Sequence, residues 1–79
     1  MLIGEFEDAI TVLEKAVKFH KRAELYYQLS NSFLNVGEEE HGQNALKMAL
    51  ELDSSLSDDM QQKYPYIKDQ VKKVKSKKK

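Results

Sequence analysis

The stretch that most constrains the fold of this chain covers residues 23–56 and reads AELYYQLSNSFLNVGEEEHGQNALKMALELDSSL. Helix-forming residues lie on both sides of Gly37, and glycine takes the left-handed conformation that ends many helices at no steric cost. Three glutamates follow at 38–40, and acidic side chains favour the positive, N-terminal end of a helix. The stretch therefore predicts a helical hairpin, with one helix over 23–36, a turn at Gly37, and a second helix ending near Asp53.

The first helix of this hairpin has two faces that differ in polarity. The more apolar stripe consists of Tyr26, Leu29, Ser30 and Phe33. The mostly polar stripe consists of Glu24, Tyr27, Gln28, Asn31 and Asn35, with Leu34 near its edge. The second helix carries a face of small residues around Gly42, and a glycine inside a helix costs about 1 kcal/mol relative to alanine. Gly42 therefore indicates the close approach of a neighbouring backbone or a bulky ring.

A helix is also predicted before the hairpin, over residues 4–21. Apolar side chains recur there at the spacing of one helix face. They are Phe6, Ala9, Ile10, Leu13, Ala16 and Val17. Acidic residues lie near the start of this helix and lysines near its end, which complements the helix dipole. Residues 20–22 are the predicted connection to the hairpin.

After the hairpin, Ser57 is the predicted N-cap of a further helix, since serine side chains accept hydrogen bonds from the first free amides. Pro65 lacks a backbone donor and clashes one turn back, so we expect a break near Tyr64 and a resumed helix from Pro65 or Tyr66. Three side chains are expected to pack this segment on the hairpin: Met60, Tyr64 and Tyr66. Residues 75–79 are predicted to be a disordered lysine-rich tail.

Composition limits the chain to one small domain. A chain of 79 residues supplies a core worth on the order of a few kcal/mol. The absence of cysteine excludes a disulfide scaffold and a thiolate metal site. No apolar run approaches the roughly 20 residues of a membrane span, and no secretory signal is present, so a cytoplasmic location is expected. Residues 1–56 carry ten acidic and five basic side chains, whereas residues 57–79 carry eight lysines and three aspartates.

An internal repeat appears when the chain is compared with itself at an offset of 33 residues. The matched pairs are Gly4 with Gly37, Glu5 with Glu38, Ala9 with Gly42, Val12 with Ala45, Leu13 with Leu46, and Ala16 with Ala49. A period in the thirties is typical of solenoids, in which each repeat buries a face on its neighbour. The first and third predicted helices are therefore versions of one unit.

At these spacings the chain resembles the tetratricopeptide repeat family. The residues that carry the resemblance are Tyr26, Leu29, Ser30, Phe33, Gly42, Leu46 and Ala49. Ser30 replaces the usual glycine, Gly42 the usual alanine and Ser54 the usual proline. Glu39 stands where an aromatic residue is common, whereas Phe6 keeps the aromatic in the earlier copy.

The resemblance implies an all-α, solenoid-type fold of about four antiparallel helices, the last one broken near Pro65. It divides the chain into a half repeat over 4–22, a full repeat over 23–56 and a capping helix over 57–74. The chain then looks like the C-terminal end of a longer array, or like a protein that completes itself by pairing.

Members of this family bind proteins or peptides, usually on the concave face formed by the first helix of each repeat. Here that face would comprise Glu24, Tyr27, Gln28, Asn31, Leu34 and Asn35. The alternative is an ordinary solvated helix face. One subset of the family grips a C-terminal carboxylate with lysine, arginine and asparagine. Asn31 matches one of those asparagines, but Tyr27 stands in place of a lysine, which argues against such a clamp.

Two other interactions remain open. The apolar side chains Phe6, Ile10, Leu13 and Val17 lack the helix that would precede them in an array, so homodimerisation could cover them.

Six C-terminal lysines could contact phosphates of nucleic acid or anionic lipid. They are Lys72, Lys73, Lys75, Lys77, Lys78 and Lys79. Aromatic residues and arginine are scarce around them, so a solubilising run is the favoured interpretation and nucleic-acid binding is not expected.

No catalytic constellation is visible in the sequence. His20 and His41 are separated without an acidic pattern that fits a metal site. Asp58 and Asp59 fit first-turn charges of a helix rather than a general acid and base. A phosphate loop and a nucleophile motif are absent. We therefore expect a non-catalytic binding module with no metal and no cofactor.

Overall fold

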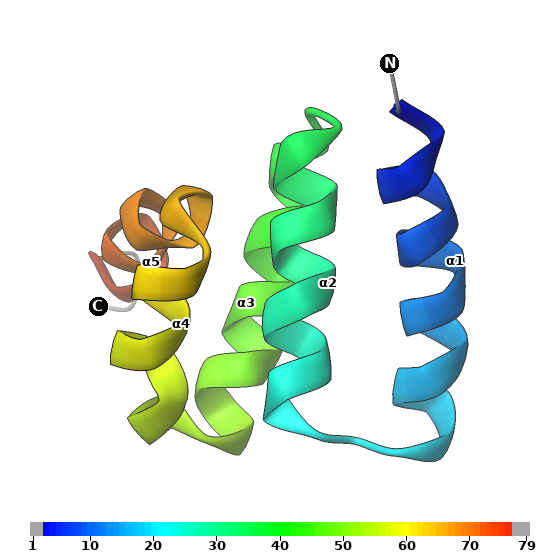
Figure 1. Cartoon of the computed structure of the whole chain (residues 1–79). Coiled ribbons are helices and arrows are strands. Elements are labelled where there is room, and N and C mark those ends of the chain that lie inside the picture. Colours follow the sequence, from blue (N-terminus) through cyan, green and yellow to red (C-terminus); the bar gives the residue numbers. More distant parts are fainter. Residues whose placement is uncertain (1–2, 77–79) are drawn as a thin grey trace.

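The computed structural model describes the backbone of residues 3–76 and the side chains of residues 6–74, and within these bounds the chain is entirely helical. Its elements are α1 (Ile3–Phe19), α2 (Ala23–Asn35), α3 (Glu39–Leu52), the short 3-10 helix η1 (Ser54–Leu56), α4 (Ser57–Lys63) and α5 (Pro65–Ser76). Helix α2 runs antiparallel to both α1 and α3, and α4 and α5 lie beyond α3 (Figure 1). The predicted all-α fold of antiparallel helices is confirmed.

The turn between α2 and α3 forms as predicted at Gly37, whose φ is +86°. The Gly37 amide donates to the Leu34 carbonyl (3.2 Å), and the Glu38 amide donates to the Phe33 carbonyl (2.9 Å). This pair of bonds satisfies two carbonyls that a helix end otherwise leaves unpaired, and it needs a left-handed residue between them. Glycine at position 37 therefore fixes the angle at which α3 returns along α2.

The close approach predicted at Gly42 is present between α2 and α3. A Cβ atom at position 42 would lie 2.7 Å from Leu34 Cδ2 and 3.4 Å from the Ser30 carbonyl oxygen. The Ser30 hydroxyl also donates a 2.7 Å hydrogen bond to the Gly42 carbonyl, and it is wholly buried. The neighbour that requires glycine is thus an aliphatic side chain, and the hydroxyl bond holds the two backbones at this distance.

The break at Pro65 also occurs where it was predicted. Helix α4 ends at Lys63, and Tyr64 is extended (φ −125°, ψ 93°), as the residue before a proline prefers. Helix α5 then begins at Pro65, because a proline in the first turn has no amide that needs a partner. It continues to Ser76, so Lys75 and Ser76 are helical rather than part of a disordered tail, and the rest of that predicted tail, 77–79, lies outside the described residues.

The predicted N-cap at Ser57 is wrong. Asp53 caps this part of the chain instead, since its Oδ1 accepts from the Ser55 amide at 3.0 Å and starts η1. Ser57 continues the helical path and is buried, and its Oγ accepts from Gln61 Nε2 at 2.9 Å. The chain therefore enters α4 from a 3-10 turn, without a side-chain cap.

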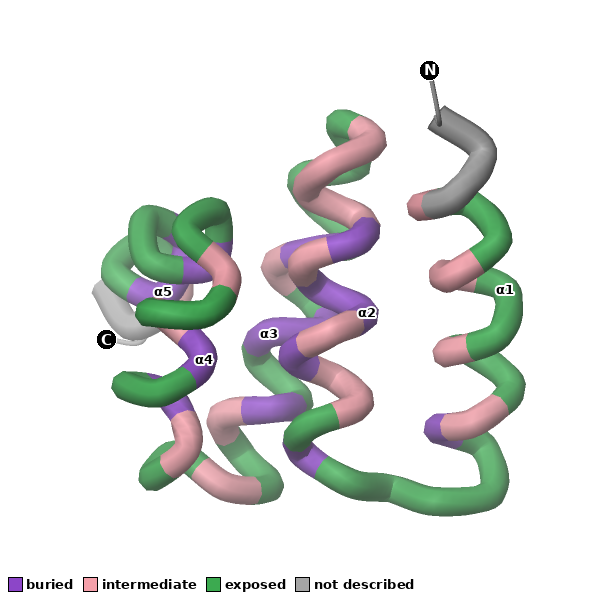
Figure 2. Tube along the Cα trace, viewed as in Figure 1, coloured by how far each residue is buried: buried purple, intermediate pink, exposed green. Residues whose placement is uncertain are grey.

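The hydrophobic core lies where α2, α3, α4 and α5 meet. Its buried members are Ala23, Tyr27, Leu46, Ala49, Met60, Ile67 and Val71. Helix α1 packs mainly on the other side of α2, and Val17 is its buried residue (Figure 2). Within the part of the chain that the structure describes, no helix combines the length and apolar character of a membrane span.

Candidate functional site

Tyr27 was predicted to lie on a partner-binding face, and its position in the structure makes that role wrong. The side chain is wholly buried, and its hydroxyl donates a 3.0 Å hydrogen bond to the Asp53 carbonyl. Burial raises the pKa of the Tyr27 phenol above its ordinary value of 10.0, and the nearby Asp53 carboxylate raises that pKa further. Tyr27 belongs to the core, where it shares one buried cluster with Met60 of α4 and with Ile67 and Val71 of α5.

The other residues of that predicted face remain at least partly accessible. Glu24 is exposed, whereas Gln28, Asn31, Leu34 and Asn35 are half-buried. The Asn35 amide donates to the backbone carbonyl of Asn31 (2.8 Å) and to its side-chain oxygen (3.2 Å). These two amides therefore bond to each other along the helix, and Leu34 is the member of the set that reaches a hollow in the surface.

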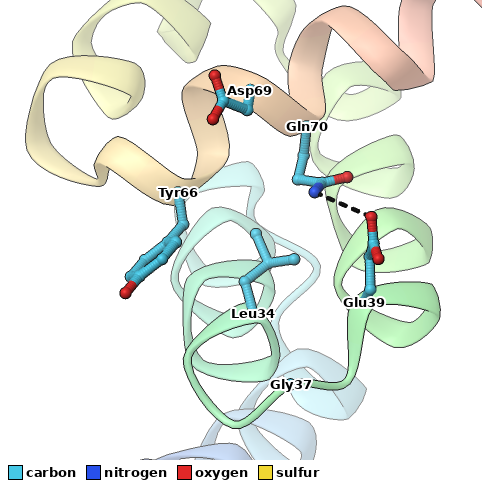
Figure 3. A pocket seen from close by; sticks show the side chains of 6 residues that line it. All are labelled: Leu34, Gly37, Glu39, Tyr66, Asp69 and Gln70. Atoms are coloured by element: carbon cyan, nitrogen blue, oxygen red, sulfur yellow. Dashed lines mark hydrogen bonds between the residues drawn. The ribbon is translucent and has the colours of Figure 1, made fainter.

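That hollow is a groove of about 250 Å³ between the end of α2, the start of α3 and the first half of α5. Its lining residues are Leu34, Gly37, Glu39, Tyr66, Asp69 and Gln70 (Figure 3). Tyr66 and Glu39 stand on opposite sides, with Leu34 between them in this view. Tyr66 is 56% exposed, so the prediction that it packs on the hairpin is wrong, whereas Met60 is buried as expected.

One wall of the groove is held by a chain of polar contacts between α3 and α5. Gln43 Nε2 donates to Gln70 Oε1 (2.8 Å), and Gln70 Nε2 donates to Glu39 Oε2 at 3.3 Å. Lys73 Nζ lies 3.4 Å from the same carboxylate oxygen. Because Gln70 is buried and bonded at both ends of its amide, this wall has a defined shape. The polar groups that α5 presents to Glu39 are thus the Gln70 amide and the Lys73 ammonium.

The groove could not be found from the sequence, because it depends on how α5 crosses the α2–α3 turn. Tyr66, Asp69 and Gln70 are far from Leu34 along the chain and meet it through tertiary packing alone. The available signal was Pro65, which starts α5 in a new direction and sets which side chains face the turn.

The stripe predicted to mediate self-association faces α2 instead of solvent, so the prediction of an uncovered face there is wrong. Val17 is buried, and Phe6, Ile10 and Leu13 are half-buried on the side of α1 turned toward α2 (Figure 2). The side chains of α1 that are open to solvent are different ones. Val12 is 64% exposed and Phe19 is 81% exposed.

The two histidines have ordinary surface surroundings. His41 Nδ1 lies 3.2 Å from Glu38 Oε1, and its ring stacks on Phe33 at a centroid distance of 5.2 Å. His20 is exposed at the end of α1. Among the side chains that the structure describes, no group of three or more His, Cys, Asp or Glu could hold a metal ion. Lys72 and Lys73 are exposed on α5, and the other lysines of the C-terminal run lie outside the described side chains.

Comparisons of the chain with protein-family models, with curated proteins and with solved structures gave no match.

Proposed function

We propose that this chain is a non-catalytic protein-interaction module of the tetratricopeptide type, which binds a peptide segment of another protein in the groove beside Leu34. The observation that carries this function is the groove itself, with an aliphatic floor, an exposed aromatic side chain and acidic residues in its lining. Peptide sites combine apolar pockets with a few fixed polar groups in this way. The repeat at an offset of 33 residues supports the family assignment.

The lining indicates a ligand with an apolar side chain next to a basic one. An aliphatic or aromatic side chain would rest on Leu34 and the ring of Tyr66. A lysine or arginine beside it would meet the Asp69 carboxylate, since that of Glu39 is already paired with Lys73, and its cation could also contact the Tyr66 ring. Exposed charge pairs of this kind contribute only about 0.2–1 kcal/mol each, so most of the affinity would come from the apolar anchor.

Binding of labelled peptide pools would test this function. Three pools would carry a central Leu-Lys, Leu-Glu or Ser-Lys pair between randomised flanks, and fluorescence anisotropy would report binding. We expect the Leu-Lys pool to bind most tightly and to weaken with added salt, because salt screens exposed charges. Tyr66→Ala should weaken binding several-fold, since it removes the aromatic wall.

Asp69→Asn separates the charge effect from the shape effect. It should weaken binding of the Leu-Lys pool. It should also reduce the difference in affinity between the Ser-Lys pool and the Leu-Glu pool. Asp58→Asn is the matched control, because Asp58 is an exposed acid on α4 that does not line the groove. Equal binding of all three pools, or equal effects of the two aspartate substitutions, would rule out peptide recognition at this site.

A further inference from the structure

Helix α3 packs through two different faces. One face, with Gly42, Ala45 and Ala49, lies against α2, as the Ser30–Gly42 hydrogen bond and the contact with Leu34 establish. A second face, with Glu39 and Gln43, contacts α5 through Gln70. A helix of this repeat unit therefore has one side for the helix before it and another side for the helix after it.

The same two faces exist on α1, because the internal repeat relates α1 to α3 residue by residue. Phe6, Ile10 and Leu13 stand 33 positions before Glu39, Gln43 and Leu46 and are half-buried. The half-buried side of α1 is turned toward α2 (Figure 2), whereas Glu39 and Gln43 contact Gln70 of α5. The other face of α1 is centred on Val12, which corresponds to Ala45. Val12 is 64% exposed, whereas Ala45 is 6% exposed, so the Val12 face of α1 has no helix against it in the described part of the chain. Ala9 and Ala16, the counterparts of Gly42 and Ala49, are half-buried.

We propose that a second copy of this chain covers this face, with the two α1 helices antiparallel and Val12 of one copy next to Val12 of the other. Phe19 is 81% exposed and lies about two turns beyond Val12, so it is on the same side of α1 and extends the apolar contact.

The charge pattern of α1 selects a second copy in this orientation. Asp8 and Lys15 flank Val12 on the same side of α1, with the acid one turn before it and the base one turn after it. Glu7, Glu14 and Lys18 lie on other sides of the helix. A copy that runs antiparallel brings the acidic half of each helix to the basic half of the other, and it also opposes the two helix dipoles. With Val12 at the two-fold axis, Asp8 of one copy comes beside Lys15 of the other, and symmetry forms that pair twice.

The α2 helix of a second copy does not fit this role, because in each copy it is already packed between α1 and α3. A single helix pair buries less than the roughly 800 Å² per partner of a standard interface, so the dimer is expected to be weak. It uses α1, which contributes no residue to the lining of the groove, and peptide binding and dimerisation can therefore fail independently.

Sedimentation equilibrium of the full chain, from micromolar to millimolar concentration, would test the dimer. We expect a concentration-dependent mass between monomer and dimer, and Val12→Glu should keep the chain monomeric. D8K and K15E should each weaken dimerisation roughly tenfold, because each reverses both symmetric pairs. Lys18→Glu is the control with the same charge change as K15E, and it should have a smaller effect because Lys18 points away from the Val12 face.

An equimolar mixture of D8K and K15E is the decisive measurement. In a mixed dimer both opposite-charge pairs are restored, so the mixture should associate about as well as the unmodified chain, although each variant alone does not. Circular dichroism of each variant would establish that the helices are intact. A chain that is monomeric throughout, a dimer insensitive to Val12→Glu, or a mixture no stronger than its components would overturn the proposal.

Discussion

The substitution Gly42→Ala sets two opposite effects against each other. Alanine stabilises a helix interior by about 1 kcal/mol relative to glycine. The new Cβ would lie 2.7 Å from Leu34 Cδ2 and 2.8 Å from its Cγ, whereas non-bonded carbons rest about 3.5–4.0 Å apart. The Ser30–Gly42 hydrogen bond of 2.7 Å opposes separation of the helices, so Leu34 must move. Overpacking of this kind costs about 1–3 kcal/mol, and we expect a net loss of about 1 kcal/mol.

A double-mutant cycle with Leu34→Ala isolates the cause. Leu34→Ala removes the atoms that the new Cβ meets, so Gly42→Ala in that background should stabilise the chain by about 1 kcal/mol. The coupling between the two positions is then about 2 kcal/mol. Urea unfolding followed by circular dichroism would give all four free energies of unfolding. If Gly42→Ala stabilises both backgrounds equally, Leu34 does not limit the approach of α3 to α2, and the packing argument is refuted.

Substitutions at two further positions test the turn and the core. Gly37→Ala should lower the free energy of unfolding by about 1–2 kcal/mol. The cause would be left-handed backbone strain alone, because nothing lies within 4 Å of the added Cβ. Gly37→Asn should lower the free energy of unfolding less, and urea unfolding would compare the two variants. Tyr27→Phe should cost about 0.5–1.5 kcal/mol through the lost bond to Asp53. Since the folded state raises the Tyr27 pKa above 10.0, this tyrosine contributes stability that is full below pH 10 and lost as the pH rises through its folded pKa. Thermal unfolding at increasing alkaline pH should therefore show a shallower decline for Tyr27→Phe than for the unmodified chain.

Features set by local chemistry were predictable from the sequence. Gly37 ends α2 because a left-handed residue is needed there, and Pro65 starts α5 because proline has no amide to pair. The tight contact at Gly42 was also predictable, since glycine inside a helix needs a steric reason. The first two depend on one residue and its nearest neighbours in the chain, whereas the residue that meets Gly42 is Leu34 of the neighbouring helix and follows from packing.

Features set by tertiary packing were not predictable in this way. Tyr27 follows a polar periodicity along α2, but in the structure it is buried in one cluster with residues of α3, α4 and α5 and bonds to Asp53 at the end of α3. The groove depends on the same path, because it brings Tyr66 beside Leu34. A period of 3.6 residues states which side chains share a face, but it does not state which neighbour covers that face.

Leu34 links the fold of the hairpin to the proposed peptide site. One side of its side chain occupies the space that Gly42 leaves free, and another side forms the floor of the groove. A ligand that packs on Leu34 therefore also affects the contact between α2 and α3. Because the domain has only a few kcal/mol of stability, ligand binding should raise its free energy of unfolding measurably. Helix α1 lies outside this connection, because it packs mainly on the far side of α2. Local unfolding should thus cost the least free energy at α1. The protection of the α1 amides from hydrogen exchange should depend on binding of the second copy rather than on binding of the peptide.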